Sequence, residues 1–155
     1  MEDELTFPYK LIDIDTGSGR FLLSMTALDK ENGFTGTFRA AYSCKGIKSD
    51  FECFVSLGDI YYFAYALDTA YDLEQVNTSA VIGDDNDLRK ISLIFIFDSK
   101  GRCHVSGHFP NKDDMFRSAV DFNCELYLSV ITDITVGINK LFDKLAEIKG
   151  DRDFY

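Results

Sequence analysis

Hydrophobic and polar residues alternate in four successive segments of the N-terminal third, a pattern that predicts half-buried β-strands. The alternating positions are Leu5, Phe7, Tyr9 and Leu11; Phe21, Leu23, Met25 and Ala27; Phe34, Gly36, Phe38, Ala40 and Tyr42; and Phe51, Cys53, Val55 and Leu57. Turn sequences separate these segments at residues 17–19, 32–33 and 45–46. Because consecutive strands joined by tight turns pair with their neighbours, this third predicts an antiparallel meander.

The hydrophobic period then changes from 2 to 3.6, which predicts an amphipathic helix. Ser56 is followed three residues later by Asp59, a spacing similar to a capping box in which Asp replaces the usual Glu. We therefore expect the helix to begin at this point. Its apolar stripe comprises Ile60, Phe63, Ala64, Leu67 and Tyr71.

A second group of strands follows. Residues 91–97 are apolar on both faces and predict a central strand, which a turn at 98–101 connects to the next. That next strand alternates at Cys103, Val105, Gly107 and Phe109, and a last one is expected around Phe116, Ser118, Val120 and Phe122. A long helix ends the chain, with Tyr127, Ile131, Ile134, Ile138, Leu141 and Leu145 at helical spacing. Strands in runs rather than in alternation with helices predict one α+β domain over residues 1–155. In this fold two amphipathic helices cover one face of a curved antiparallel sheet.

The chain is strongly acidic, with 26 Asp and Glu against 16 Lys and Arg and a formal net charge of -10. Such a charge repels nucleic acid and anionic membranes and favours a basic protein partner. The same charge also serves simply to keep a protein soluble. The acidic start of the chain, at residues 1–4, lacks the features of a secretory signal, so we expect a cytoplasmic protein.

The residues that usually carry chemistry are not arranged for it. Cys44, Cys53, Cys103 and Cys124 are widely spaced, so we expect no metal site and assign Cys53 and Cys103 to the core. Residues 84–87 begin like a calcium loop, but that loop's glycine and its bidentate glutamate are missing.

The two histidines, His104 and His108, lie on the same face of one predicted strand. Four residues of strand separate them by roughly 13 Å, which is too far to share a metal ion. We expect the two histidines to belong to a polar face of the sheet. The alternative is a hydrolase that uses either histidine. No catalytic residue, metal or cofactor is predicted.

Beside the apolar stripe of the first helix, Tyr61, Tyr65, Asp68 and Asp72 follow the spacing i, i+4, i+7, i+11. Tyrosines suit the centre of an interface, and the carboxylates would receive Lys or Arg from a basic partner. We predict that these four residues bind the partner. The alternative is that the tyrosines pack under a neighbouring loop while the aspartates are only solvated.

Three segments resemble the WapI-type immunity proteins and related small bacterial immunity families of polymorphic toxin systems. Residues 56–63 are similar to the entry into that family's first helix, residues 95–107 to its hairpin, and residues 120–128 to the segment that opens its last helix. The resemblance implies a cytosolic antidote that binds and blocks a cognate toxin domain, often a nuclease.

We therefore predict a non-catalytic immunity protein that neutralises a basic toxin domain. It is expected to be a monomer or weak homodimer that binds neither nucleic acid nor membrane. The alternative prediction is a small-ligand binding or sensing domain, with an apolar, aromatic-lined pocket between the sheet and the helices.

Overall fold

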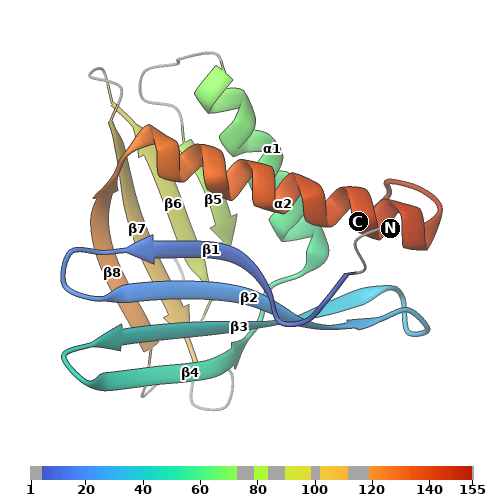
Figure 1. Ribbon diagram of the computed structural model, residues 1–155, viewed down its shortest axis with the longest axis horizontal. Coiled ribbons are helices and arrows are strands. Elements are labelled where there is room, and N and C mark those ends of the chain that lie inside the picture. The colour runs from blue at the N-terminus through green and yellow to red at the C-terminus, as the bar shows by residue number, and fades with distance from the viewer. Residues whose placement is uncertain (1–4, 73–78, 84–89, 99–101, 112–118, 155) are drawn as a thin grey trace.

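The computed structural model describes residues 5–72, 79–83, 90–98, 102–111 and 119–154. The chain passes twice through four strands and a helix (Figure 1). The first pass is β1 (Tyr9–Asp15), β2 (Arg20–Asp29), β3 (Thr35–Cys44), β4 (Ile47–Cys53) and α1 (Leu57–Asp72). The second pass is β5 (Ser79–Gly83), β6 (Ser92–Phe97), β7 (Cys103–Pro110), β8 (Ala119–Leu126) and α2 (Leu128–Lys149).

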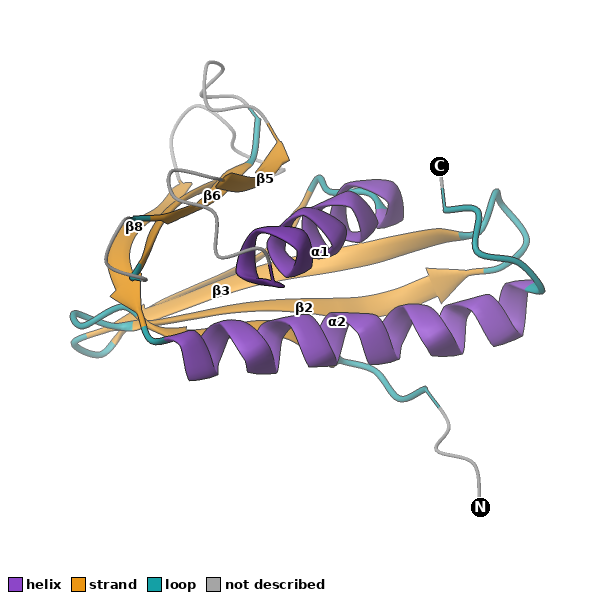
Figure 2. Cartoon of the chain, turned by 90° about the horizontal axis from the view of Figure 1, so that it is seen from above, coloured by secondary structure: helices purple, strands orange, loops and turns teal. Residues whose placement is uncertain are grey.

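The predicted α+β class and antiparallel meanders are confirmed. Each meander forms a sheet of its own, with strand orders β1-β2-β3-β4 and β5-β6-β7-β8, which we call the first and the second sheet. Figure 2 shows α1 in the angle between them. Each helix contacts a strand of the other half, because α1 packs against β5 and α2 packs against β1.

Several boundaries differ from the expected ones. The first strand begins at Tyr9 rather than Leu5, and Leu57 opens α1 instead of ending the fourth strand. The short strand β5 was not predicted. Only two of its residues, Ala80 and Ile82, point inward, and two inward apolar positions make too weak an alternating pattern. Of the predicted last strand, Phe116 and Ser118 lie outside the described residues.

The capping box at the start of α1 is confirmed. The backbone N–H of Ser56 donates to Asp59 Oδ2 at 3.0 Å, and the N–H of Asp59 donates to Ser56 Oγ at 3.0 Å. Two amide groups that the helix leaves without partners are thus satisfied reciprocally. This pair starts the helix a few residues after β4 ends. The element that follows the first sheet in the chain is therefore α1, which packs against β5 of the second sheet.

Aromatic rings join the two sheets. Phe21 of β2 lies with its ring centroid 4.6 Å from that of Phe122 and 4.9 Å from that of Phe109, on β8 and β7. Gly107 is paired with Phe122 across the strands, and a Cβ at this glycine would lie 2.3 Å from the Phe122 ring. The glycine therefore leaves the space in which Phe122 lies over β7 and reaches the first sheet.

The buried residues of both sheets and both helices belong to one hydrophobic cluster. The hydroxyl of Tyr9 on β1 also donates to the Gly137 carbonyl of α2 at 2.6 Å. No helix in the described part of the chain is long and apolar enough to cross a membrane.

We expect Gly107→Ala to lower the free energy of unfolding by about 1–3 kcal/mol, because the added methyl group displaces the Phe122 ring. Gly137→Ala in α2 is the matched control, since its added Cβ meets no atom within 4 Å. Alanine favours a helix over glycine, so this control should be neutral or more stable by up to about 1 kcal/mol. Urea unfolding followed by circular dichroism measures both, and equal stability of the two variants would contradict this account of the sheet junction.

Candidate partner-binding surface

The four residues predicted to bind a partner do not share one environment on α1. Tyr61 is half-buried, with its ring centroid 5.2 Å from that of Phe142 and 5.5 Å from that of Phe154. Tyr65 is 70% exposed and Asp68 is half-buried. The side chain of Asp72 lies outside the described part of α1. Tyr61 thus helps to pack α1 against α2 and the C-terminal segment.

Tyr62, which the sequence analysis did not select, is 54% exposed. It lies three residues before Tyr65, so the two tyrosines are neighbours on the surface of α1. The spacing of three could have identified this pair. Among the described side chains of α1, the exposed aromatic stripe therefore consists of Tyr62 and Tyr65 rather than Tyr61 and Tyr65, while a binding role for this helix stays a prediction.

The second sheet has an outer face that points away from α1 (Figure 2). Side chains alternate along its strands, so Leu93 and Phe95 are buried while Ile94 and Ile96 point outward. The strand register aligns the outward residues in rows across the sheet. We call this surface the outer face; it comprises Val81, Ile94, Ile96, His104, Ser106, His108, Asp121, Asn123 and Glu125.

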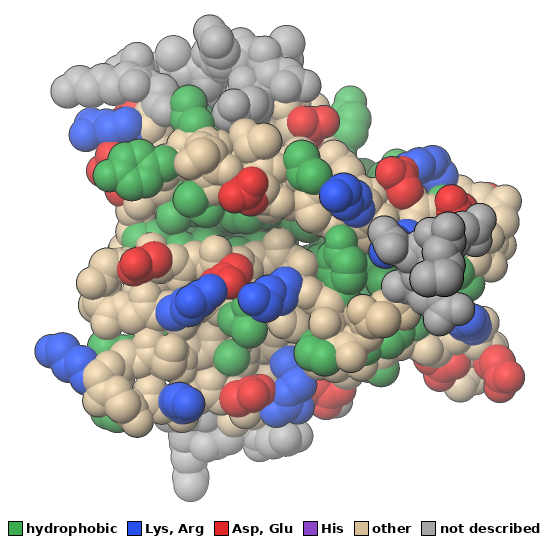
Figure 3. Space-filling model, in the orientation of Figure 1, with side chains coloured by type: hydrophobic (Ala, Val, Ile, Leu, Met, Phe, Trp, Pro, Cys, Tyr) green, Lys and Arg blue, Asp and Glu red, His purple; other side chains and the backbone are tan. Residues whose placement is uncertain are grey.

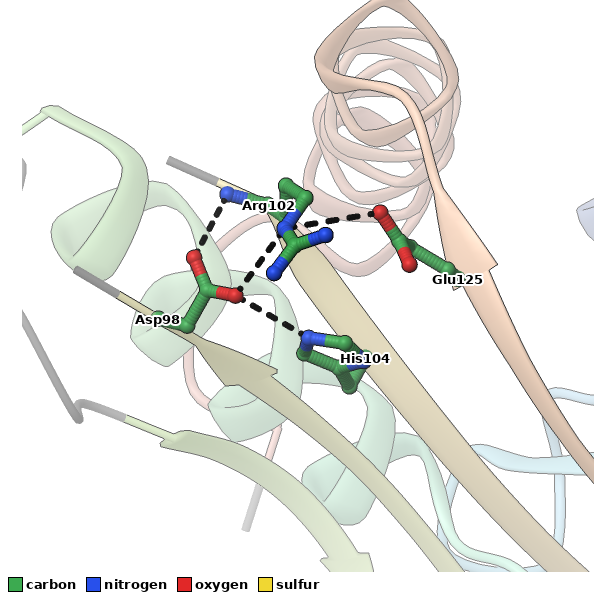
Figure 4. A network of polar contacts seen from close by, with 4 residues as sticks. All are labelled: Asp98, Arg102, His104 and Glu125. Carbon is green, nitrogen blue, oxygen red and sulfur yellow. Dashed lines mark hydrogen bonds and ion pairs between the residues drawn. The ribbon is translucent and has the colours of Figure 1, made fainter. Parts of the chain in front are cut away.

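One end of the outer face carries a connected group of charged side chains (Figure 4). Asp98 Oδ2 lies 3.1 Å from His104 Nε2 and accepts a hydrogen bond from Arg102 Nε at 3.2 Å. The backbone N–H of Arg102 donates to the other carboxylate oxygen, Oδ1, at 3.0 Å. Arg102 Nε also lies 3.7 Å from Glu125 Oε1, which extends the group from the ends of β6 and β7 to β8. Asp98 is therefore the centre that holds His104 and Arg102 in place.

The other rows of the outer face also pair across β7 and β8. His108 Nδ1 lies 2.5 Å from Asp121 Oδ1, and Ser106 Oγ donates to Asn123 Oδ1 at 2.6 Å. The prediction that both histidines lie on one face of a strand is confirmed. Each imidazole lies against a carboxylate, and no group of three or more His, Cys, Asp or Glu in the described residues could hold a metal ion.

The outer surface of the first sheet also carries paired charges, and there the cations belong to the strands themselves. Arg20 binds Asp13 through two nitrogens at 2.6 and 2.5 Å, and its hydrogen bond holds the pKa of the Asp13 carboxyl below the ordinary value. Arg39 Nε donates to Asp50 Oδ1 at 2.8 Å. Figure 3 shows the side on which β1–β4 and α2 lie in front, where basic and acidic side chains are interspersed. The charges of Asp13 and Asp50 are therefore compensated locally.

A groove of about 570 Å³ opens at the start of α1. Aromatic side chains of Phe34, Tyr62 and Phe154 line it together with the charged residues Asp59 and Lys149. The predicted pocket between the sheets and the helices would occupy space that Phe38, Phe63 and Phe95 fill as fully buried side chains. The groove instead lies at the rim, between the turn that joins β2 to β3 and the C-terminal segment.

All four cysteines are free thiols. Cys53 and Cys103 are buried, as predicted, and burial raises the pKa of each thiol to about 12. A thiolate is the nucleophilic form of cysteine, and burial disfavours it. Neither buried cysteine is therefore prepared for nucleophilic chemistry.

No protein-family model matches the chain, and no match is found among the curated proteins.

We expect iodoacetamide at pH 8 to leave Cys53 and Cys103 unmodified in the native protein, because both thiols stay protonated and inaccessible. Cys44, which is only half-buried, should be alkylated under the same conditions. Peptide mass spectrometry measures the sites, and labelling in guanidinium chloride is the control in which all four should react. Fast alkylation of native Cys53 would show that its strand is not packed as described.

Proposed function

We propose that this chain is a non-catalytic binding protein that neutralises a basic, nuclease-like toxin domain in the cytoplasm. The observation that carries the proposal is the position of its titratable groups. His104, His108 and their carboxylate partners lie on an exposed sheet face. Catalysis requires groups that converge on a substrate in a site sheltered from water. Surface groups held in fixed positions suit recognition of another macromolecule.

The overall charge supports the same proposal. A net charge of -10 on 155 residues accelerates encounter with a basic protein through long-range attraction. Toxin domains that act on nucleic acid need a basic surface to bind phosphates. An acidic inhibitor competes for that surface directly. The resemblance of residues 56–63, 95–107 and 120–128 to WapI-type immunity proteins agrees with this role.

Co-expression tests the proposal. We expect the protein to copurify with the product of the gene immediately upstream of its own and to restore growth to cells in which that product is toxic. Binding should weaken as salt increases, because screening shortens the range of the charge attraction. Growth rescue by a variant that no longer binds, or an upstream gene for a metabolic enzyme that neither binds nor kills, would refute it.

A second candidate function is binding of a small ligand, which the groove of about 570 Å³ with Phe34, Tyr62 and Phe154 favours. A ligand held there would raise the melting temperature, because it binds the folded state alone. A thermal-shift screen of metabolites measures this, with Tyr62→Ala as the variant that should lose the response. A metabolite that stabilises the wild type and the variant equally would not be bound in this groove.

A further inference from the structure

We propose that the outer face of the second sheet is the surface that binds the basic partner. On this face Asp121 receives a cationic side chain, while Val81, Ile94 and Ile96 receive an apolar one. The inference rests on the proposed function and adds to it the location of the interface and the chemistry of the partner's contact residues.

The first step is that the face is accessible. The residues Val81 and Ile96 are 41% and 44% exposed, and the side chains of His104 and Glu125 are each 48% exposed. The inner side of the same sheet is closed by core residues and by the contact of α1 with β5. Because the inner side is fully packed, the outer face is the side of this sheet on which another molecule can bind.

The second step is the division of the face into two chemical halves. Val81 and Ile94 are directly paired across β5 and β6, and Ile96 follows Ile94 on the same side of β6. Acidic residues stand on the opposite edge strand, β8, where Asp121 is 67% exposed. His104, Ser106 and His108 of β7 lie between the two halves. A partner must therefore offer an apolar group on one side and a cation on the other.

The third step is charge complementarity. The strands β5–β8 contain no Lys or Arg, whereas β1–β4 contain Lys10, Arg20, Arg39 and Lys48. On the first sheet an incoming cation would compete with these side chains for the same carboxylates. On the second sheet Arg102, which precedes β7, already lies beside Asp98 and Glu125 at one end of the outer face. At Asp121, towards the other end, the neighbour among the described residues is the imidazole of His108. Asp121 is thus a better receiver of a partner's Lys or Arg than Asp13 or Asp50, which already bind arginines.

The fourth step is preorganisation. Hydrogen bonds and ion pairs hold His104, His108, Ser106 and Asn123 on the strands before a partner arrives. Side chains that are already fixed lose little conformational entropy on binding. Residues of α1 such as Tyr65, at 70% exposure, lack this restraint from packing. The outer face is therefore favoured over the exposed stripe of α1.

The spacing of the halves limits what fits. Neighbouring strands lie about 4.8 Å apart, so β6 and β8 are separated by about 10 Å. The register places Ile96 opposite His104 and Asp121 opposite His108, so Ile96 and Asp121 are also offset by four residues along the strands, about 13 Å, and lie about 16 Å apart. In an α-helix residues i and i+11 lie about 16.5 Å apart on one face. A basic helix laid obliquely across the strands would place an aliphatic residue on Ile96 and an Arg or Lys at i+11 near Asp121. We therefore infer that the partner contributes an amphipathic, basic helix.

The test uses a synthetic amphipathic helical peptide rich in Leu and Arg, added to ¹⁵N-labelled full-length protein and followed by NMR. We expect amide shifts to change in β6, β7 and β8. A control peptide with Glu in place of Arg should change none of them. Shifts centred on Tyr62 and Tyr65 of α1, shifts centred on the first sheet, or no binding at all would overturn the inference.

Matched variants test the contacts. Asp121→Asn and Ile96→Thr should each weaken peptide binding by about tenfold. Asp50→Asn and Ile47→Thr are the controls, because Asp50 is 64% exposed against 67% for Asp121 and Ile47 is 74% exposed on β4. Their binding should stay close to that of the wild type. Equal weakening by Asp121→Asn and Asp50→Asn would indicate general charge attraction and overturn the inference.

The same variants separate this inference from the proposed function. If the upstream-encoded protein is captured and neutralised equally by wild type, Asp121→Asn and Ile96→Thr, the function stands and the surface is wrong. If no such protein is captured, the function fails, while the peptide titration still decides whether this face binds a basic helix. Dispersed NMR spectra of each variant confirm that the fold is intact. Dimers that dissociate in the Ile96→Thr variant would assign the face to a second copy of the chain and overturn the inference.

Discussion

The structure depends on the contact of Phe21 with Phe109 and Phe122, which joins two sheets that do not share strand hydrogen bonds. Phe21 and Phe109 are fully buried, so these rings contribute apolar burial in addition to their mutual attraction. Gly107 makes the contact possible, since any side chain there would displace Phe122. Without this junction the two meanders would be separate sheets, each with an exposed apolar side.

The helices also hold the two sheets together, because each helix packs against a strand of the other sheet. α1 follows the first sheet in the chain and packs on β5, while α2 follows the second sheet and packs on β1. Each half therefore needs the other half's helix to cover its apolar residues. The capping box of Ser56 and Asp59 supports this arrangement, because it starts α1 a few residues after β4 ends. In the described part of the chain the inner sides of both sheets are therefore covered by core residues and helices.

This distribution explains why the two sheets present different outer surfaces. On the first sheet Arg20 and Arg39 compensate neighbouring carboxylates on the same surface. On the second sheet the strands carry carboxylates and histidines but no Lys or Arg. The cation of the second sheet's outer face, Arg102, instead comes from the segment before β7 and lies beside Asp98 and Glu125 at one end of that face.

Local features were determined by the sequence alone. Alternation in β2, β3 and β7, the turn glycines, the capping box and the long stripe of α2 each depend on residues close together in the chain, where side-chain period and backbone preference decide the outcome. The common face of His104 and His108 belongs to this group, because it follows from the period of a strand. Their carboxylate partners could not be predicted, since Asp121 meets His108 only through the register of β7 and β8.

Tertiary structure decided the rest. The sequence pattern predicted two meanders, but whether they form one sheet or two depends on long-range packing of rings such as Phe21 and Phe122. Strand β5 exists because α1 and β6 cover it, although its five residues carry little pattern of their own. Tyr61 and Tyr65 have the same local spacing signal, yet α2 and Phe154 bury one side of Tyr61 and leave Tyr65 exposed. Period and capping act over a few residues and can be read from the chain. Burial, register and the choice of outer face arise from contacts between residues far apart in the sequence, which no local pattern encodes.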